Sequence, residues 1–283
     1  MSLSLKVRNG ELIDFTCPKV MGILNVTPDS FYAPSRKQSE ESIRQRVNEI
    51  TRGGATFIDV GAYSTRPGAE LISAEEEMSR LRFALPIIRE ANVKNLILSV
   101  DTFRGDVARM CVEEYGVDII NDISGGEFDP TLFPTLSRLH VPYVLSHIKG
   151  DIHTMHQETT YSNIVREMFF YFSTKIKMLH DLGVCDIILD PGFGFGKLYY
   201  HNYEVMGHLQ DFKEFQLPIL VGISRKSMIT KLLHIPTEET LNATTALNAI
   251  ALTKGADIIR VHDVQQANEA VTLYHFTNLA KFR

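Results

Sequence analysis

The sequence of 283 residues is poor in cysteine and has no long hydrophobic run. Its three cysteines, Cys17, Cys111 and Cys185, are far apart and odd in number, which argues against a disulfide framework or a Cys-x-x-Cys metal pair. No apolar stretch approaches the roughly 18 residues that cross a membrane, and residues 1–13 lack the pattern of a signal peptide. We therefore expect a cytoplasmic protein without a membrane partner.

An excess of positive charge is also missing. The chain has 29 Lys and Arg against 34 Asp and Glu, a formal net charge of -5. Nucleic-acid binding needs a basic surface, so we expect no nucleic-acid partner. A few basic side chains in a cleft can still bind an anionic small molecule, whatever the overall sign. No linker or shift of composition divides the chain, and we expect residues 1–283 to form one domain.

Short apolar runs alternate with longer amphipathic stretches from residue 19 onward. Such near-continuous apolar runs are typical of parallel strands buried on both faces. The eight runs are 20–26, 55–60, 96–100, 117–123, 141–146, 185–189, 219–223 and 256–261. Between two of them, Ser73-x-x-Glu76 forms a capping box ahead of an amphipathic helix. Ser39 or Ser42 would open another helix.

A polar residue closes nearly every predicted strand. The series is Asn25, Asp59, Asp101, Asn121, His147, Asp190, Ser224 and His262. Its average spacing of about 34 residues is the length of a βα unit. Eight such units predict an α/β fold, a (β/α)₈ TIM barrel with catalytic residues at the carboxyl ends of the strands. A doubly wound open sheet is the competing topology.

The first 17 residues do not fit this repeat. Leu3–Val7 alternates in polarity like a strand, Asn9-Gly10 supplies a turn, and Leu12–Phe15 would form the second strand. We expect a short antiparallel hairpin that covers one end of the barrel, with a structural role.

Three strand-end residues, Asp101, Asn121 and Asp190, would project into one mouth of the barrel. Together they offer hydrogen-bond acceptors and donors suited to a planar heterocycle with amino and ring N–H groups. The alternative is that each one caps the helix that follows it. Lys226 begins a helix, where its charge opposes the helix dipole. It would neutralise Asp190 or donate to a ring oxygen, and its neighbour Arg225 would be solvated.

Arg260 and His262 alternate on the last strand and therefore point to the same side. The loops after strands seven and eight often bind phosphate in such barrels, and the planar fork of Arg suits it. The alternative is a structural ion pair with Asp263 or another carboxylate. Long turn-rich loops follow the first two strands, at 25–32 and 62–68. The glycines of residues 190–197 would let the backbone approach a ligand, beside an apolar face from Phe193 or Phe195.

These residues form a recognisable set, and the chain resembles the dihydropteroate synthase family over its whole length. Seven segments carry the resemblance, in the order of the family: 21–31 (MGILNVTPDSF), 57–62 with 64–68 (FIDVGA, STRPG), 99–103 (SVDTF), 120–124 (INDIS), 190–197 (DPGFGFGK), 222–227 (GISRKS) and 260–264 (RVHDV). The barrel of that family agrees with the spacing of the strand ends.

The resemblance implies a reaction and a set of site residues. A dihydropterin methyl pyrophosphate condenses with p-aminobenzoate, and pyrophosphate is released. By analogy, the pterin is held by Asp101, Asn121, Asp190, Lys226 and Arg260, of which Asp101, Lys226 and Arg260 are the catalytic candidates. Asn25 would bind Mg²⁺ on the pyrophosphate, with Thr65, Arg66, Arg260 and His262 around the anion. The p-aminobenzoate pocket, where sulfonamides compete, would be walled by Phe31, Pro67, Phe195 and Ser227. The family suggests a homodimer, and apolar residues of a late helix (Leu247, Ile250 and Leu252) are candidates for its interface.

The chain departs from the family pattern at three places. Ala33 replaces an acidic residue of the first loop, Tyr63 stands where Glu is usual, and Ser146–Gly150 reads SHIKG in place of MHMQG. Two alternatives remain open at this point. A methyltetrahydrofolate–corrinoid methyltransferase shares the barrel but has no use for the pyrophosphate residues. A non-catalytic pterin-binding barrel agrees with Ala33 but not with the intact Asn25, Asp101, Lys226 and Arg260.

Overall fold

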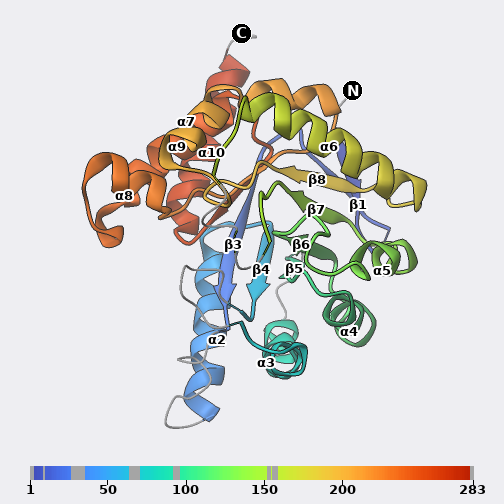
Figure 1. Ribbon diagram of the computed structural model, residues 1–283. Coiled ribbons are helices and arrows are strands. Elements are labelled where there is room, and N and C mark those ends of the chain that lie inside the picture. The colour runs from blue at the N-terminus through green and yellow to red at the C-terminus, as the bar shows by residue number, and fades with distance from the viewer. Residues whose placement is uncertain are drawn as a thin grey trace.

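The computed structural model describes residues 3–8, 10–26, 36–63, 71–91, 96–151, 154 and 159–280. Eight parallel strands form one sheet that curls into a nearly closed barrel (Figure 1). They are β3 (Lys19–Asn25), β4 (Phe57–Gly61), β5 (Ile97–Asp101), β6 (Ile119–Asp122), β7 (Tyr143–Ser146), β8 (Ile187–Asp190), β9 (Leu220–Val221) and β10 (Ile258–Val261). The TIM-barrel prediction is confirmed, and each apolar run supplies one strand.

Helices alternate with the strands and surround the barrel. They are α2 (Arg36–Arg52), α3 (Ala74–Glu90), α4 (Gly105–Tyr115), α5 (Leu132–Leu139), α6 (Ile164–Asp181), α7 (Tyr199–Gly207), α8 (Ser227–Leu233), α9 (Leu241–Thr253) and α10 (Val264–Ala280). Short 3₁₀ helices span Leu209–Phe215 and Thr237–Glu239. Ser73 is the N-cap of α3, as predicted, since its side chain accepts a hydrogen bond from the Glu76 amide. Helix α2 begins at Arg36, ahead of the predicted Ser39 or Ser42, and Ser39 is buried.

The seam between β8 and β9 closes the barrel. The sheet runs in the order β8-β7-β6-β5-β4-β3-β10-β9, so β8 and β9 are its two edges. A single parallel bridge between Leu189 and Ile219 joins them in this fully described region. The Leu189 amide donates to the Pro218 carbonyl at 2.8 Å across the same seam. The seam is therefore the thinnest part of the hydrogen-bonded wall.

Alternation along the strands divides the barrel into an outer and an inner set of side chains. The outer set, such as Val20, Ile58 and Leu98, packs under the helices in the largest hydrophobic cluster. The inner set is apolar near the start of each strand. Its members there are Met21, Phe57, Ile97, Ile119, Val144, Ile188, Leu220 and Ile258, of which Ile97 is only partly buried. Further along the same strands the inner positions become polar, so the barrel has an apolar floor and a polar mouth.

The predicted N-terminal hairpin covers that floor. Strands β1 (Ser4–Lys6) and β2 (Leu12–Asp14) pair antiparallel, with Leu5 opposite Ile13. Leu5 and Ile13 are buried against the inner apolar side chains. The Lys6 amide also donates to Asp186, just before β8. The hairpin thus closes the amino end of the barrel and leaves the carboxyl end for ligands.

Candidate functional site

The centre of the mouth is an arginine held between two carboxylates. Arg260 lies on β10, and its Nε and Nη2 atoms each lie 2.7 Å from Asp59 Oδ2. Arg260 Nη2 also donates to Asp101 Oδ2 at 2.9 Å. Burial lowers the pKa of Arg260, but the charges of Asp59 and Asp101 outweigh it and raise that pKa. Arg260 is therefore a fixed cation with its guanidinium plane held in place.

Asp59 links this cation to the rest of the mouth. It is fully buried and accepts hydrogen bonds from Asn121 Nδ2 at 2.8 Å and from Ser99 Oγ at 2.5 Å. Asp59 belongs to the series of strand-end residues, yet sequence reasoning gave it no site role. Asp59 lies two residues before Gly61, the last residue of β4, so both positions face the inside of the barrel. This alternation along the strand is the sequence signal that could have placed Asp59 in the mouth.

The amide of Asn121 is only partly satisfied. Its Nδ2 donates to Asp59, whereas its buried Oδ1 accepts no hydrogen bond from the described residues. A buried acceptor without a donor costs free energy, roughly 1–3 kcal/mol. Asn121 therefore presents a carbonyl oxygen to any N–H group that enters the mouth.

Asp101 ends β5 with both carboxylate oxygens engaged. Oδ2 accepts from Arg260, and Oδ1 accepts from the hydroxyl of Tyr63 at 2.9 Å. Burial raises the pKa of Asp101, as does the charge of Asp59, while Arg260 and the Tyr63 hydroxyl oppose the rise. The sequence-based alternative, in which Asp101 and Asn121 cap helices, is wrong, because helices α4 and α5 begin after Arg104 and Thr131.

Asp190 and Lys226 lie on the other side of the mouth. Asp190 ends β8 and accepts a hydrogen bond from the Gly192 amide at 2.7 Å. Lys226 precedes α8, donates to the Phe193 carbonyl and lies 4.4 Å from the centre of the Phe195 ring. Burial lowers the pKa of Lys226 to about 8, although the charge of Asp190 opposes that shift. Burial raises the pKa of Asp190 against the charge of Lys226.

The glycine-rich segment packs closely against other parts of the protein. Gly192 has φ +67°, and a Cβ atom there would lie 2.0 Å from the His147 carbonyl oxygen. Lys197 holds the segment by donating to the carbonyls of Gly192 at 2.9 Å and Phe195 at 3.0 Å. Phe193 is fully buried, so Phe195 supplies the apolar face.

His262 lies beside Arg260 and is paired with a serine. Ser224 Oγ is 3.0 Å from His262 Nδ1. Burial lowers the pKa of His262 to about 4, helped by the charge of Arg260, so the ring is neutral at pH 7. The ion pair offered as an alternative is present at Arg260, but its partners are Asp59 and Asp101. Arg225 bonds to Asp263 instead, at 2.6 and 3.0 Å, and is not simply solvated.

Other predicted residues lie at the rim or outside the described residues. Asn25 ends β3 and is exposed, with its Oδ1 atom 3.5 Å from the position of a Cβ on Gly61. Ser227 is exposed at the start of α8. Phe31, Ala33, Thr65, Arg66 and Pro67 fall outside the described residues.

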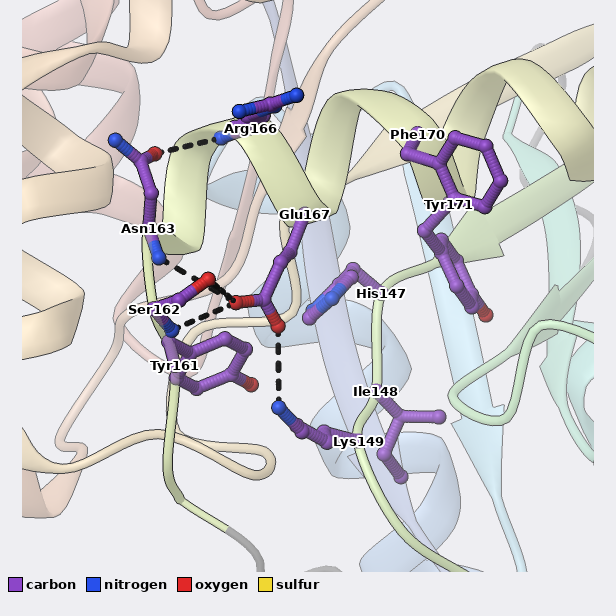
Figure 2. Close-up of a pocket in the computed structure, with 10 residues that line it drawn as sticks. All are labelled: His147, Ile148, Lys149, Tyr161, Ser162, Asn163, Arg166, Glu167, Phe170 and Tyr171. Atoms are coloured by element: carbon purple, nitrogen blue, oxygen red, sulfur yellow. Dashed lines mark hydrogen bonds and ion pairs between the residues drawn. The ribbon is translucent and has the colours of Figure 1, made fainter.

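A cavity of about 730 Å³ lies between the segment after β7 and the start of α6, apart from this cluster (Figure 2). Its wall includes Ile148, Lys149, Tyr161 and Phe170. Glu167 joins its polar groups to one another, because it accepts from Lys149 at 3.1 Å and from the Ser162 amide at 2.8 Å. None of the predicted site residues that the structure describes lines this cavity. Three residues of the SHIKG segment (146–150), namely His147, Ile148 and Lys149, line this cavity.

Comparison with known proteins identifies the class. Residues 21–262 match the family model described as "Pterin binding enzyme". The barrel with its polar mouth is thus that of a pterin-binding enzyme. The chain is 40% identical to the dihydropteroate synthase of Escherichia coli K12 over 275 residues, 96% of each protein. It is also 40% identical to that of Synechocystis over 250 residues, 87% of this chain and 85% of the relative.

Solved structures agree. A Yersinia pestis dihydropteroate synthase with a sulfonamide drug complex has a TM-score of 0.88 at 36% identity, covering 98% of this chain and 99% of that one. A Xanthomonas albilineans dihydropteroate synthase with 4-aminobenzoic acid has a TM-score of 0.88 at 33% identity, with the same coverage. This chain belongs to the dihydropteroate synthase family, the transferases of folate biosynthesis. That membership supports the synthase over the methyltransferase and non-catalytic alternatives.

Proposed function

We propose that the mouth of the barrel binds a dihydropterin methyl pyrophosphate and transfers its pterin methylene to the amine of p-aminobenzoate. The observation that carries this assignment is the buried Asn121 carbonyl oxygen, which has no donor among the described residues, in a cluster that also contains Asp59, Asp101 and Arg260. A pterin edge carries amino and ring N–H groups, which would satisfy such acceptors.

The two sides of the mouth would hold opposite edges of the ring. Asn121 and Asp190 would accept from the amino and ring N–H groups, and Lys226 would donate to the ring oxygen. The guanidinium of Arg260, fixed by Asp59 and Asp101, would pack on the face of the ring. Arg suits this role because its planar cation stacks on flat π systems.

The pyrophosphate would lie beside Arg260 and His262. Because the His262 ring is neutral, it would act as a hydrogen-bond donor or acceptor and Arg260 would supply the charge. Thr65 and Arg66 are proposed to complete this anion site. Neutralisation of the charge that develops on the leaving group lowers the barrier to its departure.

Mg²⁺ would be held by Asn25 together with the pyrophosphate. The described residues contain no group of three His, Cys, Asp or Glu side chains able to hold a metal ion. Asn25 nevertheless presents an exposed amide at the mouth. Mg²⁺ keeps several waters and often binds through one or two protein oxygens plus substrate phosphates, so the fit is good. When bound, the ion supplies charge neutralisation on the phosphate oxygens.

Cleavage of the C–O bond to pyrophosphate would leave a cationic methylene conjugated to the pterin. Asp101 and Asp190, both at strand ends beside the ring, would stabilise that cation. The neutral amine of p-aminobenzoate then forms the C–N bond, and its proton leaves to solvent or to pyrophosphate. Phe195 and Ser227, with Phe31 and Pro67, would wall the p-aminobenzoate pocket.

Release of pyrophosphate from the dihydropterin pyrophosphate, with Mg²⁺ present, tests this function. We expect release that depends on p-aminobenzoate, and an Asp101→Asn variant that loses about 100-fold in kcat, the usual scale for one stabilising group. Pterin binding without turnover in the wild type would instead support a non-catalytic barrel. If Asp101→Asn left the rate intact while pterin still bound, its role in stabilising the cation would be wrong.

We further propose a homodimer formed through α9 and α10. These helices pack side by side (Figure 1). Leu273 and Phe276 of α10 are 71% and 66% exposed, and Ile250 of α9 is 43% exposed. Of the other two residues suggested by the sequence, Leu252 is buried and Leu247 packs partly against the core. Sedimentation velocity of a Leu273→Lys/Phe276→Lys variant is the test, and we expect a monomer.

We also propose a cytoplasmic location. All three cysteines are free, and Cys185 is exposed, as suits a reducing compartment. No helix in the described part of the chain is long and apolar enough to cross a bilayer. Fractionation of cells that express the protein would test the location.

A further inference from the structure

Tyr63 contacts the mouth although sequence reasoning treated it only as a departure from the family pattern. It lies two residues beyond β4, and its hydroxyl donates to Asp101 Oδ1 at 2.9 Å. Burial and the charge of Asp101 raise the pKa of the Tyr63 phenol well above its usual value. The hydroxyl therefore keeps its proton at neutral pH and remains a donor.

The ring of Tyr63 is fixed by aromatic packing. It is 8% exposed and meets Phe103 edge to face, with ring centres 5.4 Å apart. Phe103 in turn meets Phe128 at 5.5 Å in the same arrangement. Such pairs have a preferred geometry, so the hydroxyl is presented from a rigid base.

Asp101 is thereby held from two directions. Arg260 takes one carboxylate oxygen and Tyr63 takes the other, so rotation of the carboxylate would break at least one bond. Asp101 is also beside the negative charge of Asp59, and a hydrogen bond to the ionised form opposes that repulsion. An ionised glutamate at position 63 has no proton to donate, whereas a tyrosine has.

We propose that Tyr63 is a positioning residue that orients Asp101 for the pterin. The inference rests on the proposed role of Asp101. Tyr63 would act through Asp101 without touching the reacting atoms, and the tyrosine at this position would be a specific adaptation of this chain.

Tyr63→Phe tests the proposal, since it keeps the ring and removes the donor. We expect kcat/KM for the pterin substrate to fall about tenfold, the scale of a hydrogen bond to a charged group. The binding constant for 6-hydroxymethylpterin, measured by calorimetry, should weaken in parallel. Loss of the donor raises the pKa of Asp101, so the acidic limb of the kcat/KM profile should move to higher pH.

Tyr143→Phe is the matched control. Tyr143 donates to Asp122 at 2.6 Å, and both residues are buried on the outer face of the barrel. It removes a Tyr–Asp hydrogen bond of the same kind away from the mouth. We expect lower stability from this variant, with an unchanged pH profile and unchanged pterin binding.

A second variant protects the test if Tyr63→Phe does not fold. Site-specific replacement of Tyr63 by 3-fluorotyrosine makes the phenol more acidic and a stronger donor. We expect the acidic limb to move to lower pH, opposite to the effect of Tyr63→Phe. An unmoved limb would count against the proposal.

The double variant Tyr63→Phe/Asp101→Asn separates this inference from the proposed function. If Tyr63 acts through Asp101, its removal should have little further effect once Asp101 is Asn. If Tyr63→Phe had its full effect in the Asp101→Asn background, the inference would be overturned while the proposed function would stand. The same holds if Asp101→Asn were inactive while Tyr63→Phe kept full activity and an unchanged pH profile of kcat/KM. If Asp101→Asn itself left binding and turnover unchanged, the proposed role of Asp101 and this inference would both fall.

Discussion

The substitution Asp59→Asn should destabilise the protein strongly although it changes a single atom type. Asp59 is fully buried and bonded to Arg260, Asn121 and Ser99. The asparagine oxygen can still accept from Arg260 and Asn121, while its amide group turns toward the Ser99 hydroxyl. The main loss is therefore the negative charge that balances a buried guanidinium.

The magnitude follows from the pairing of Arg260. Breaking a buried ion pair from one side costs about 3–5 kcal/mol. Arg260 keeps Asp101 at 2.9 Å, and the hydrogen bonds to position 59 can survive. We therefore expect a loss of about 2–4 kcal/mol in the free energy of unfolding, somewhat less than that range. For a protein of this size the melting temperature should fall by roughly 5–10 °C.

Urea unfolding of the wild type and the variant measures this loss, and steady-state kinetics measures its effect at the site. We expect kcat/KM to fall as well, because Arg260 loses one of the two negative charges that hold it in place. Glu114→Gln is the control, since the Arg82–Glu114 pair is 48% exposed on both sides and should contribute under about 1 kcal/mol. An Asp59→Asn protein within about 0.5 kcal/mol of the wild type, with normal kinetics, would refute this reasoning, because a buried pair would then behave like a surface pair.

Three further outcomes are expected from other parts of the molecule. Lys226 has a pKa of about 8, so kcat/KM for the pterin substrate should fall as pH rises through that value and the ammonium loses its charge. Lys226→Arg should abolish this alkaline limb of the pH profile. Gly192→Ala would place a Cβ atom 2.0 Å from the His147 carbonyl oxygen at φ +67°, so we expect a loss of several kcal/mol in urea unfolding, and near-normal stability would contradict the described packing. Leu5→Ala opens a cavity at the barrel floor and should lower the free energy of unfolding by about 2–4 kcal/mol, which thermal melts measure. Steady-state kinetics should show an unchanged KM for both substrates, because the floor lies at the opposite end from the mouth.

The regular part of the fold was predictable because it repeats. Apolar runs and polar strand ends recur at each βα unit, and period-2 alternation decides which side chains face inward. The same pattern placed Asp101, Asn121, Asp190 and Arg260 around one mouth. Their roles in catalysis stay predictions.

What the sequence did not show are contacts between residues far apart in the chain. The bond from Arg260 to Asp59 spans 201 positions, and the pairing of Arg225 with Asp263 spans 38. Local sequence patterns contain no information on which carboxylate each arginine pairs with. The close packing of Gly192 and Gly196 was missed for the same reason, because the backbone that they approach belongs to a segment about 45 positions earlier.

The β8–β9 seam has a consequence for how the barrel responds to its substrate. Asp190 follows one side of the seam and Lys226 follows the other, and the wall between them holds together through one bridge in this described region. A pterin that contacts both residues would span the seam as a cross-link. Binding should then slow amide hydrogen exchange at Leu189, because local opening of the wall would first require the ligand to leave. The bound substrate would therefore also stabilise the wall of the barrel at the seam.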